Sequence, residues 1–491
     1  MTDDKAFATL DGLGLADEIA AGRITPLEAV DAAIRIIERH NPVLKAVVME
    51  RFDAARAEAK KMAPGGGLFA GVPFLAKDMN VFTADMPTTF SSRFFAEAAP
   101  RGDSEIVRRW KQAGLIILGK TSTPEFAADF VTEPSFRGPC RNPWNPDVTP
   151  GGSSGGAAAA VASGMVPMAH GTDSGGSIRV PAACCGLVGF KPSRGLTPSG
   201  PFYPELAGGL NCDHALTRSV RDTAAMLDIT VGPEPGGAYY IPKPAEAYRD
   251  AIRRKPPRRR IAYTATAPSG VTAMPEIVAL LDRTVEILRR QGHELIPVAL
   301  PADVDPYDTA AKLWMPPLAL EIEERERALG RAAQDEELEA LSRYSRQVAG
   351  KMTALDYLRA RQRAHDITVA MARFSESFDL LLTPTIGTLP PAIGAIDSRS
   401  ASFDHDAWQE GAYYFAPFTE LFNITGQPAI SLPLFRTETG MPAGMHLIGK
   451  IGQDVELLQL AAALESDVSG EGVSGDGVSG GGADARPALW G

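Results

Sequence analysis

Short apolar runs alternate with amphipathic helical segments along most of this 491-residue chain. The stretch "TPLEAVDAAIRIIERHN", residues 25–41, opens with a capping box that places proline at the first helical position. Apolar runs such as "LIILGK" (115–120) and "FDLLLTPT" (378–385) have the length and composition of buried strands. Strands that alternate with helices favour a sheet covered by helices on both faces. The sequence therefore predicts an α/β fold.

The domain organisation is expected to be simple until the end of the chain. No linker rich in Pro, Gly or Ser divides the sequence earlier, so we expect one domain over residues 1–465. Within it, residues 317–377 are charged and helical in pattern, which predicts an outer helical layer. Residues 468–482 repeat a short Val/Ser/Gly unit that has almost nothing to bury. We therefore expect residues 466–491 to form a disordered tail.

The net charge indicates which classes of partner are unsuitable, and the N-terminal sequence and the cysteines indicate where the protein is located. A formal charge of −11 argues against nucleic acid or an anionic membrane as the main partner. No run reaches 18 apolar residues and the acidic N-terminus lacks a signal-peptide pattern, so we expect no membrane span and a cytoplasmic protein. Four cysteines (Cys140, Cys184, Cys185 and Cys212) lack metal-ligand spacing, so we expect reduced thiols and no metal site.

Two familiar motifs match the letters but not the expected structure around them. "GLIILGKT", residues 114–121, fits the phosphate-binding P-loop pattern, but its four variable positions are apolar and favour a buried strand. "GGSSG", residues 151–155, fits the nucleophile elbow of α/β-hydrolases, yet it follows a proline-broken loop instead of a strand. We interpret the first as a strand. An esterase of the α/β-hydrolase type stays open as an alternative for the second.

Two glycine-rich stretches, "TPGGSSGG" (149–156) and "HGTDSGGS" (170–177), present serines that need a base if either is a nucleophile. His170 is close in sequence to the second stretch, but it falls in an expected strand and we assign it a structural role. Lys77 is the other candidate, because it ends the apolar run of "FAGVPFLAKDMNV". Burial would lower the pKa of such a lysine and let it act as a base.

Five segments in this order resemble the amidase signature family: "FAGVPFLAKDMNV", "GKTSTPEF", "NPW", "GGSSGGAAAAVASG" and "GTDSGGSIRVPAACCGLVGFKPS". The resemblance implies a mixed central sheet between helical layers, with the signature core at residues 70–230 and a variable helical region at 235–377. It also implies a hydrolase that cleaves carbon–nitrogen acyl bonds and needs no cofactor. Within the family, "TPE", "TEP" and "RNPWNP" resemble hydrolases of 6-aminohexanoate cyclic dimer and urethane-cleaving enzymes.

Carried over by position, the resemblance assigns the catalytic groups. Ser177 is the expected nucleophile, Ser153 the relay and Lys77 the terminal base. A cis peptide is expected between Gly152 and Ser153. The remaining implied residues form an oxyanion hole from the backbone of Ser174, Gly175 and Gly176, and a brace for that loop from Asp173 and Arg179.

The substrate is less constrained by the sequence. Phe126, Ala128 and Phe130 occupy a stretch that lines the acyl pocket in several members of the family, and we expect Trp314, Tyr414 and Phe415 to join them. Uncharged amides are the expected substrates, with carbamates and nylon-type oligoamides as further candidates.

Two questions about partners stay open. A glutaminase subunit of a tRNA-dependent amidotransferase is an alternative, although Ala416 replaces the aspartate that would recognise glutamine. The sequence also leaves a homodimer open.

Overall fold

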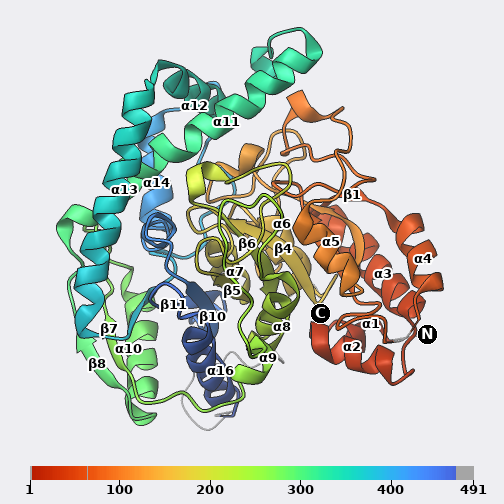
Figure 1. The fold of residues 1–491 in the computed structure, drawn as a ribbon, viewed down its shortest axis with the longest axis horizontal. Coiled ribbons are helices and arrows are strands. Elements are labelled where there is room, and N and C mark those ends of the chain that lie inside the picture. The colour runs from red at the N-terminus through yellow and green to blue at the C-terminus, as the bar shows by residue number, and fades with distance from the viewer. Residues whose placement is uncertain (1–2, 64, 471–491) are drawn as a thin grey trace.

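A computed structural model describes residues 3–63 and 65–470, and its centre is one mixed sheet (Figure 1). In the described part of the chain this sheet has eleven strands. Four neighbouring pairs (β2/β3, β2/β4, β7/β8 and β7/β9) are parallel and the other pairs are antiparallel. In spatial order the strands are β1 (Val47–Glu50), β3 (Ile116–Thr121), β2 (Pro73–Lys77), β4 (Met168–Asp173), β6 (Cys212–Thr217), β5 (Val188–Lys191), β10 (Ala429–Arg436), β11 (Pro442–Ile448), β9 (Leu380–Pro384), β7 (Arg260–Tyr263) and β8 (Glu294–Pro297).

Helices cover both faces of the central part of the sheet. Every residue of β2, β3, β4, β5, β6, β9 and β11 is buried, which requires cover on both faces. The α/β expectation is therefore confirmed. The helices are α1 (Asp4–Phe7), α2 (Gly12–Ala20), α3 (Pro26–Leu44), α4 (Phe52–Lys61), α5 (Glu105–Gln112), α6 (Gly155–Ala162), α7 (Arg179–Cys185), α8 (Val220–Thr230), α9 (Tyr248–Ala251), α10 (Pro275–Arg290), α11 (Tyr307–Leu329), α12 (Ala340–Lys351), α13 (Ala354–Phe374), α14 (His405–Phe415), α15 (Leu421–Ile424) and α16 (Asp454–Gly470).

Local sequence signals account for several of these elements. Thr25 and Glu28 form the expected capping box at the start of α3, with the Glu28 N–H donating to Thr25 Oγ1 at 3.2 Å. The P-loop-like stretch lies in β3, and its lysine, Lys120, is fully buried and hydrogen-bonds to Thr88 and to the Val81 carbonyl. A buried strand with a partnered lysine offers no phosphate cradle, so the interpretation as a strand is confirmed.

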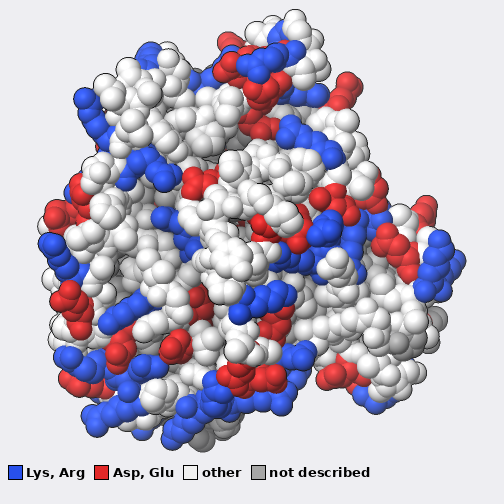
Figure 2. Space-filling model, in the orientation of Figure 1, with Lys and Arg blue, Asp and Glu red and all other residues white. Residues whose placement is uncertain are grey.

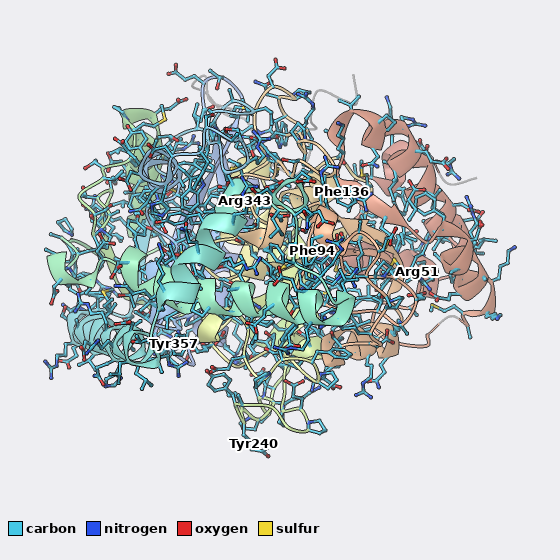
Figure 3. All side chains as sticks on the ribbon, turned by 90° about the horizontal axis from the view of Figure 1, so that it is seen from above. Arg51, Phe94, Phe136, Tyr240, Arg343 and Tyr357 are labelled. Carbon is cyan, nitrogen blue, oxygen red and sulfur yellow. The ribbon has the colours of Figure 1, made fainter. Side chains whose placement is uncertain are left out.

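The expected outer helical layer is made by α11, α12 and α13, which lie together on one side of the molecule in Figure 1. Leu318 and Ile322 of α11 pack on an aromatic cluster that includes Phe90, Phe94 and Phe126. Figure 3 shows this side from above, with Phe94 and Arg343 labelled near the layer. The layer thus covers the aromatic cluster on this side of the molecule.

The end of the chain corrects one expectation. Helix α16 continues to Gly470, so residues 466–470 are helical and do not belong to a tail. Leu464 and Val468, one helical turn apart on either side of the expected boundary, are both buried in the core, which explains why the helix continues past residue 465. The rest of the expected tail, residues 471–491, lies outside the described residues.

The distribution of surface charge and the hydrophobicity of the helices concern the expected absence of nucleic-acid and membrane partners. Figure 2 shows acidic and basic side chains interspersed over the face drawn there. Among the helices of the described residues, none is long and apolar enough to cross a membrane.

Candidate active site

Lys77 ends strand β2 and is fully buried beneath the two glycine-rich loops. Its Nζ lies 2.7 Å from Ser153 Oγ, 3.0 Å from Ser154 Oγ and 2.8 Å from Thr172 Oγ1. The apolar run before Lys77 places it in the sheet, and the neighbouring strand β4 supplies Thr172. The sheet therefore holds the amine against the Ser153 hydroxyl.

Burial changes the acidity of this amine. It lowers the pKa of Lys77 from 10.5 to about 7, while the charges of Asp213 and Asp173 act in the opposite direction. A large fraction of Lys77 is therefore neutral near pH 7 and able to accept a proton. A lysine that keeps its ordinary pKa stays protonated at this pH, so a lysine base depends on this burial.

His170 lies behind the lysine and has no direct access to the serines. Its Nδ1 accepts from the backbone N–H of Lys77 at 3.3 Å, and its Nε2 lies 3.0 Å from Asp213 Oδ1. Both ring nitrogens are thus used in supporting β2 and β6. This arrangement fits the structural role expected for His170.

The first loop brings Ser153 to the lysine. The peptide bond between Gly152 and Ser153 is cis, as the family resemblance implies. A Cβ on Gly152 would lie 2.7 Å from the carbonyl carbon of Phe130, so only glycine allows this close approach. The backbone N–H of Ser154 donates to the carbonyl of Ser177 at 3.1 Å, which ties the first loop to the second.

The second loop is braced from behind by a buried ion pair. Arg179 Nη2 and Nε donate to the two carboxylate oxygens of Asp173 at 2.7 and 2.9 Å. Asn423 donates to the Asp173 carboxylate at 2.9 Å and to its carbonyl at 2.8 Å. Burial raises the pKa of Asp173, but the Arg179 guanidinium outweighs it and holds the pKa well below its ordinary value. This geometry suits the bracing role that the resemblance assigns to Asp173 and Arg179.

The backbone of the second loop has N–H groups without an acceptor beside the cavity. In the part of the chain that the structure describes, the N–H groups of Gly175, Gly176 and Ser177 donate to no protein acceptor. Gly176 has a φ of +139°, and a Cβ there would lie 2.2 Å from Thr419 Oγ1. Unpaired donors beside a serine are the arrangement that stabilises an oxyanion. Ser174 also lines the cavity, and its hydroxyl donates to Asn211 Oδ1 at 3.0 Å.

A cavity opens in front of Ser153 and Ser177, whose side chains line it. The expected pocket residues Phe126, Ala128, Phe130 and Trp314 also line it. Tyr413, from the aromatic run 413–415, lines it as well. Three further aromatic residues that sequence reasoning did not assign to the pocket complete the wall: Phe90, Tyr203 and Trp408.

Two expected pocket residues are corrected by the structure. Tyr414 is 53% exposed on the outer side of α14, and Phe415 is buried in the core instead of lining the cavity. Tyr413 faces the cavity, with its ring 5.9 Å from that of Phe130. Successive residues of an α-helix point about 100° apart, so three consecutive aromatics cannot share one face.

Sequence reasoning also missed the acidic lining of the cavity. Asp129, Glu205, Glu321 and Glu420 all line it. Asp129 lies inside the stretch already assigned to the pocket, and its position between Ala128 and Phe130 was the available signal. Glu420 had no such neighbour in sequence. In the described residues no group of three or more His, Cys, Asp or Glu is placed to hold a metal ion.

Comparison with known proteins finds similar amidases and amide hydrolases. A family model described as amidase matches residues 28–458. A 6-aminohexanoate-cyclic-dimer hydrolase from Paenarthrobacter ureafaciens is 34% identical over 93% of this chain and 94% of its own. A putative amidase, AmiC, from Mycobacterium leprae is 36% identical over 94% and 96% of the two chains. The structure of 6-aminohexanoate cyclic dimer hydrolase complexed with substrate aligns with a TM-score of 0.91 and 31% identity, covering 99% of this chain and 100% of that one.

Proposed function

The chain belongs to the amidase signature family and is an amide hydrolase, and from this premise we propose that it works through an acyl-enzyme on Ser177. One observation carries the proposal. A buried lysine lies 2.7 Å from the hydroxyl of Ser153, in the loop that is hydrogen-bonded to Ser177. A neutral amine in this position can draw a proton through Ser153 from Ser177.

The proposed reaction has two halves. Ser177 Oγ attacks the amide carbonyl while its proton passes to Ser153 Oγ, whose own proton passes to Lys77 Nζ. The backbone N–H groups of Ser174, Gly175, Gly176 and Ser177 donate to the oxyanion. The tetrahedral intermediate then expels the amine, which takes a proton from Ser153 as Lys77 returns one to Ser153.

The second half uses the same groups. Water attacks the acyl-enzyme carbonyl and gives its proton along the same path. Collapse of this intermediate releases the carboxylic acid and restores the Ser177 hydroxyl. No atom from outside substrate and water enters the products.

We propose amides of aminoalkanoic acids as the first substrate candidates and carbamates as the second. The likeness to hydrolases of 6-aminohexanoate cyclic dimer over more than nine-tenths of the chain supports the first class. The mostly aromatic and apolar cavity wall can hold an alkyl chain. In a carbamate, as in an amide, the bond to be cleaved joins the carbonyl carbon to nitrogen. The same catalytic groups can therefore act on it.

We propose a small-molecule partner and a cytoplasmic location. The four cysteines support this location, because all of them are buried and free of disulfides.

The activity is expected to rise with pH through about pH 7. Below this pH Lys77 carries a proton and cannot accept another, because its pKa is lowered to about 7 by burial. We expect kcat/KM for an uncharged anilide to fall about tenfold for each pH unit below the midpoint. Initial rates between pH 5.5 and 9 measure this profile. A profile that stays flat from pH 6 to 8 would contradict a lysine base with this pKa.

Amine release from a substrate panel tests the function. The panel holds a simple aliphatic amide, an anilide, 6-aminohexanoate cyclic dimer, an aryl carbamate and glutamine, each assayed with the natural protein and with Ser177→Ala. Release from any of the first four, lost in the variant, supports the proposal and identifies the substrate branch. Ammonia from glutamine alone would favour the amidotransferase subunit, and release that persists in Ser177→Ala would overturn the nucleophile.

A further inference from the structure

The charged side chains that line the active-site cavity are all acidic. Asp129, Glu205, Glu321 and Glu420 reach it, and in the described part of the chain no Lys, Arg or His lines it. Carboxylates gathered in a cleft with an apolar wall create a negative potential that attracts cations. An apolar pocket alone would favour uncharged amides, so this acidic lining adds a new constraint on the substrate.

Two of the four carboxylates already have partners at the mouth of the cavity. Glu321 accepts from Arg101 at 2.9 Å and from the Tyr203 hydroxyl at 2.8 Å. Glu205 accepts from the Tyr239 hydroxyl and lies 3.4 Å from Arg361. Their charges are therefore largely balanced without a ligand.

Asp129 and Glu420 are different. Each is 5% exposed, and Asp129 Oδ2 and Glu420 Oε2 meet no donor in hydrogen-bond geometry among the described residues. Of the side chains that the structure describes, only neutral ones interact closely with them: Ser398 and Trp408 with the Asp129 carboxyl, and the Tyr413 hydroxyl with that of Glu420. The other Asp129 oxygen accepts from the backbone N–H of Phe130 at 2.7 Å. Buried carboxylate oxygens are almost always hydrogen-bonded, so two cavity-lining carboxyls that each keep one oxygen without a donor are suited to accept hydrogen bonds from a ligand.

The two carboxyls lie beside the two catalytic loops. Asp129 directly precedes Phe130, whose backbone packs against Gly152 in the first loop. Glu420 Oε1 lies 3.2 Å from where a Cβ of Gly175 would be in the second loop. Both carboxyls therefore line the same cavity as Ser177.

The acidity of both groups responds to a bound cation. Burial raises the pKa of Asp129 to about 6. It raises the pKa of Glu420 to about 8; the Tyr413 hydroxyl and Arg179 oppose this rise and Asp305 adds to it. A cation in contact with either carboxyl favours the ionised form, so cation binding and ionisation reinforce each other.

We propose that Asp129 and Glu420 form a subsite that binds the protonated amino group of an aminoalkyl amide while Ser177 attacks its amide carbonyl. The inference rests on the proposed function and names the class of amide. The apolar wall holds the alkyl chain, and the two carboxyls accept hydrogen bonds from the ammonium group. A substrate with a carboxylate at the same end is repelled by the same groups.

Three anilides of matched length test the subsite. 6-Aminohexananilide carries the ammonium group, heptananilide replaces it with a methyl group, and the monoanilide of adipic acid replaces it with a carboxylate. We expect kcat/KM to be about 10- to 100-fold higher for the ammonium compound than for the methyl compound, and lowest for the carboxylate. Equal values for the ammonium and methyl compounds would overturn the proposal.

Isosteric variants locate the effect. Glu420→Gln and Asp129→Asn keep the shape of each side chain and remove its charge, so each should reduce the preference toward unity. Glu321→Gln is the matched control, because its carboxylate lines the same cavity but is already paired with Arg101. A preference that survives in both Glu420→Gln and Asp129→Asn would overturn the assignment.

A binding measurement separates this inference from the catalytic one. Ser177→Ala keeps the cavity and removes the proposed nucleophile, so calorimetry can follow binding without turnover. 6-Aminohexananilide should bind about tenfold tighter than heptananilide or better. Tighter binding without any turnover by the natural protein would count against the acyl-enzyme and support the subsite, whereas equal binding would refute the subsite whatever the turnover.

Discussion

Ser177→Ala is expected to lower kcat/KM for amide substrates by about 10⁴- to 10⁶-fold, the loss typical when the nucleophile of a coupled catalytic set is removed. Without Ser177 Oγ no acyl-enzyme can form, and Ser153 and Lys77 have no proton to transfer. The change removes one oxygen atom from a loop held by the Asp173–Arg179 pair, so the fold should remain. Steady-state rates on an anilide and mass spectrometry of the trapped acyl-enzyme measure the effect.

The control for this variant lies three residues away. Ser174 lines the same cavity, but its hydroxyl is hydrogen-bonded to Asn211 at 3.0 Å and its proposed catalytic contribution is from the backbone. Ser174→Ala should therefore cost less than about tenfold, since the backbone N–H is kept. A collapse of activity in Ser174→Ala beside an active Ser177→Ala would exchange the roles of the two serines.

Lys77→Met is expected to lower amide turnover by about 10²- to 10⁴-fold, the usual contribution of a positioned general acid–base group. Methionine has a similar length and no charge, so it fits a fully buried site better than a shorter side chain. The loss should be smaller for a nitrophenyl ester, because a phenolate leaves without a proton whereas an amine does not. The ratio of amide to ester turnover is thus the diagnostic measurement.

A second buried lysine provides the control for Lys77→Met. Lys120 lies in the neighbouring strand β3, is also fully buried and is hydrogen-bonded to Thr88 outside the cavity. Lys120→Met should reduce the free energy of unfolding, because Asp78 loses its partner 3.9 Å away, but should leave the amide-to-ester ratio unchanged. Unchanged amide turnover in Lys77→Met would remove lysine as the base.

The proposed catalytic groups could be assigned from sequence because each lies in a contiguous motif that carries the family resemblance. Lys77 ends an apolar run, and Ser153 and Ser177 each lie in a glycine-rich stretch, so the residues and their spacing are visible in one dimension. The tertiary structure adds the pairing of the strands and the burial of the lysine, which the sequence does not show. The sheet brings β2 and β4 together, and burial between them makes Lys77 a base near neutral pH.

The cavity wall could be predicted only where it follows the chain locally. Phe126 and Phe130 lie close to the signature motifs and line the cavity as expected. In α14 the aromatic run 413–415 shows that the pocket has an aromatic helix nearby, but it does not show which residue faces inward. Tyr413 does so because the rotation of the helix is set by Phe415 packing in the core on another side.

By itself the sequence determined the α/β class and the strand character of the P-loop-like segment, because periodicity is a local property. Its contiguous motifs also carried the family resemblance that assigns the candidate catalytic residues. Only the tertiary structure decided which side chains share the cavity with Ser177. Asp129 and Glu420 are 291 positions apart in the chain numbering, and the segment after α14 packs against Gly175 and Gly176, which brings both to one cavity. Long-range packing also buries both carboxyls and sets which donors reach their oxygens, and no local pattern in the sequence contains that information.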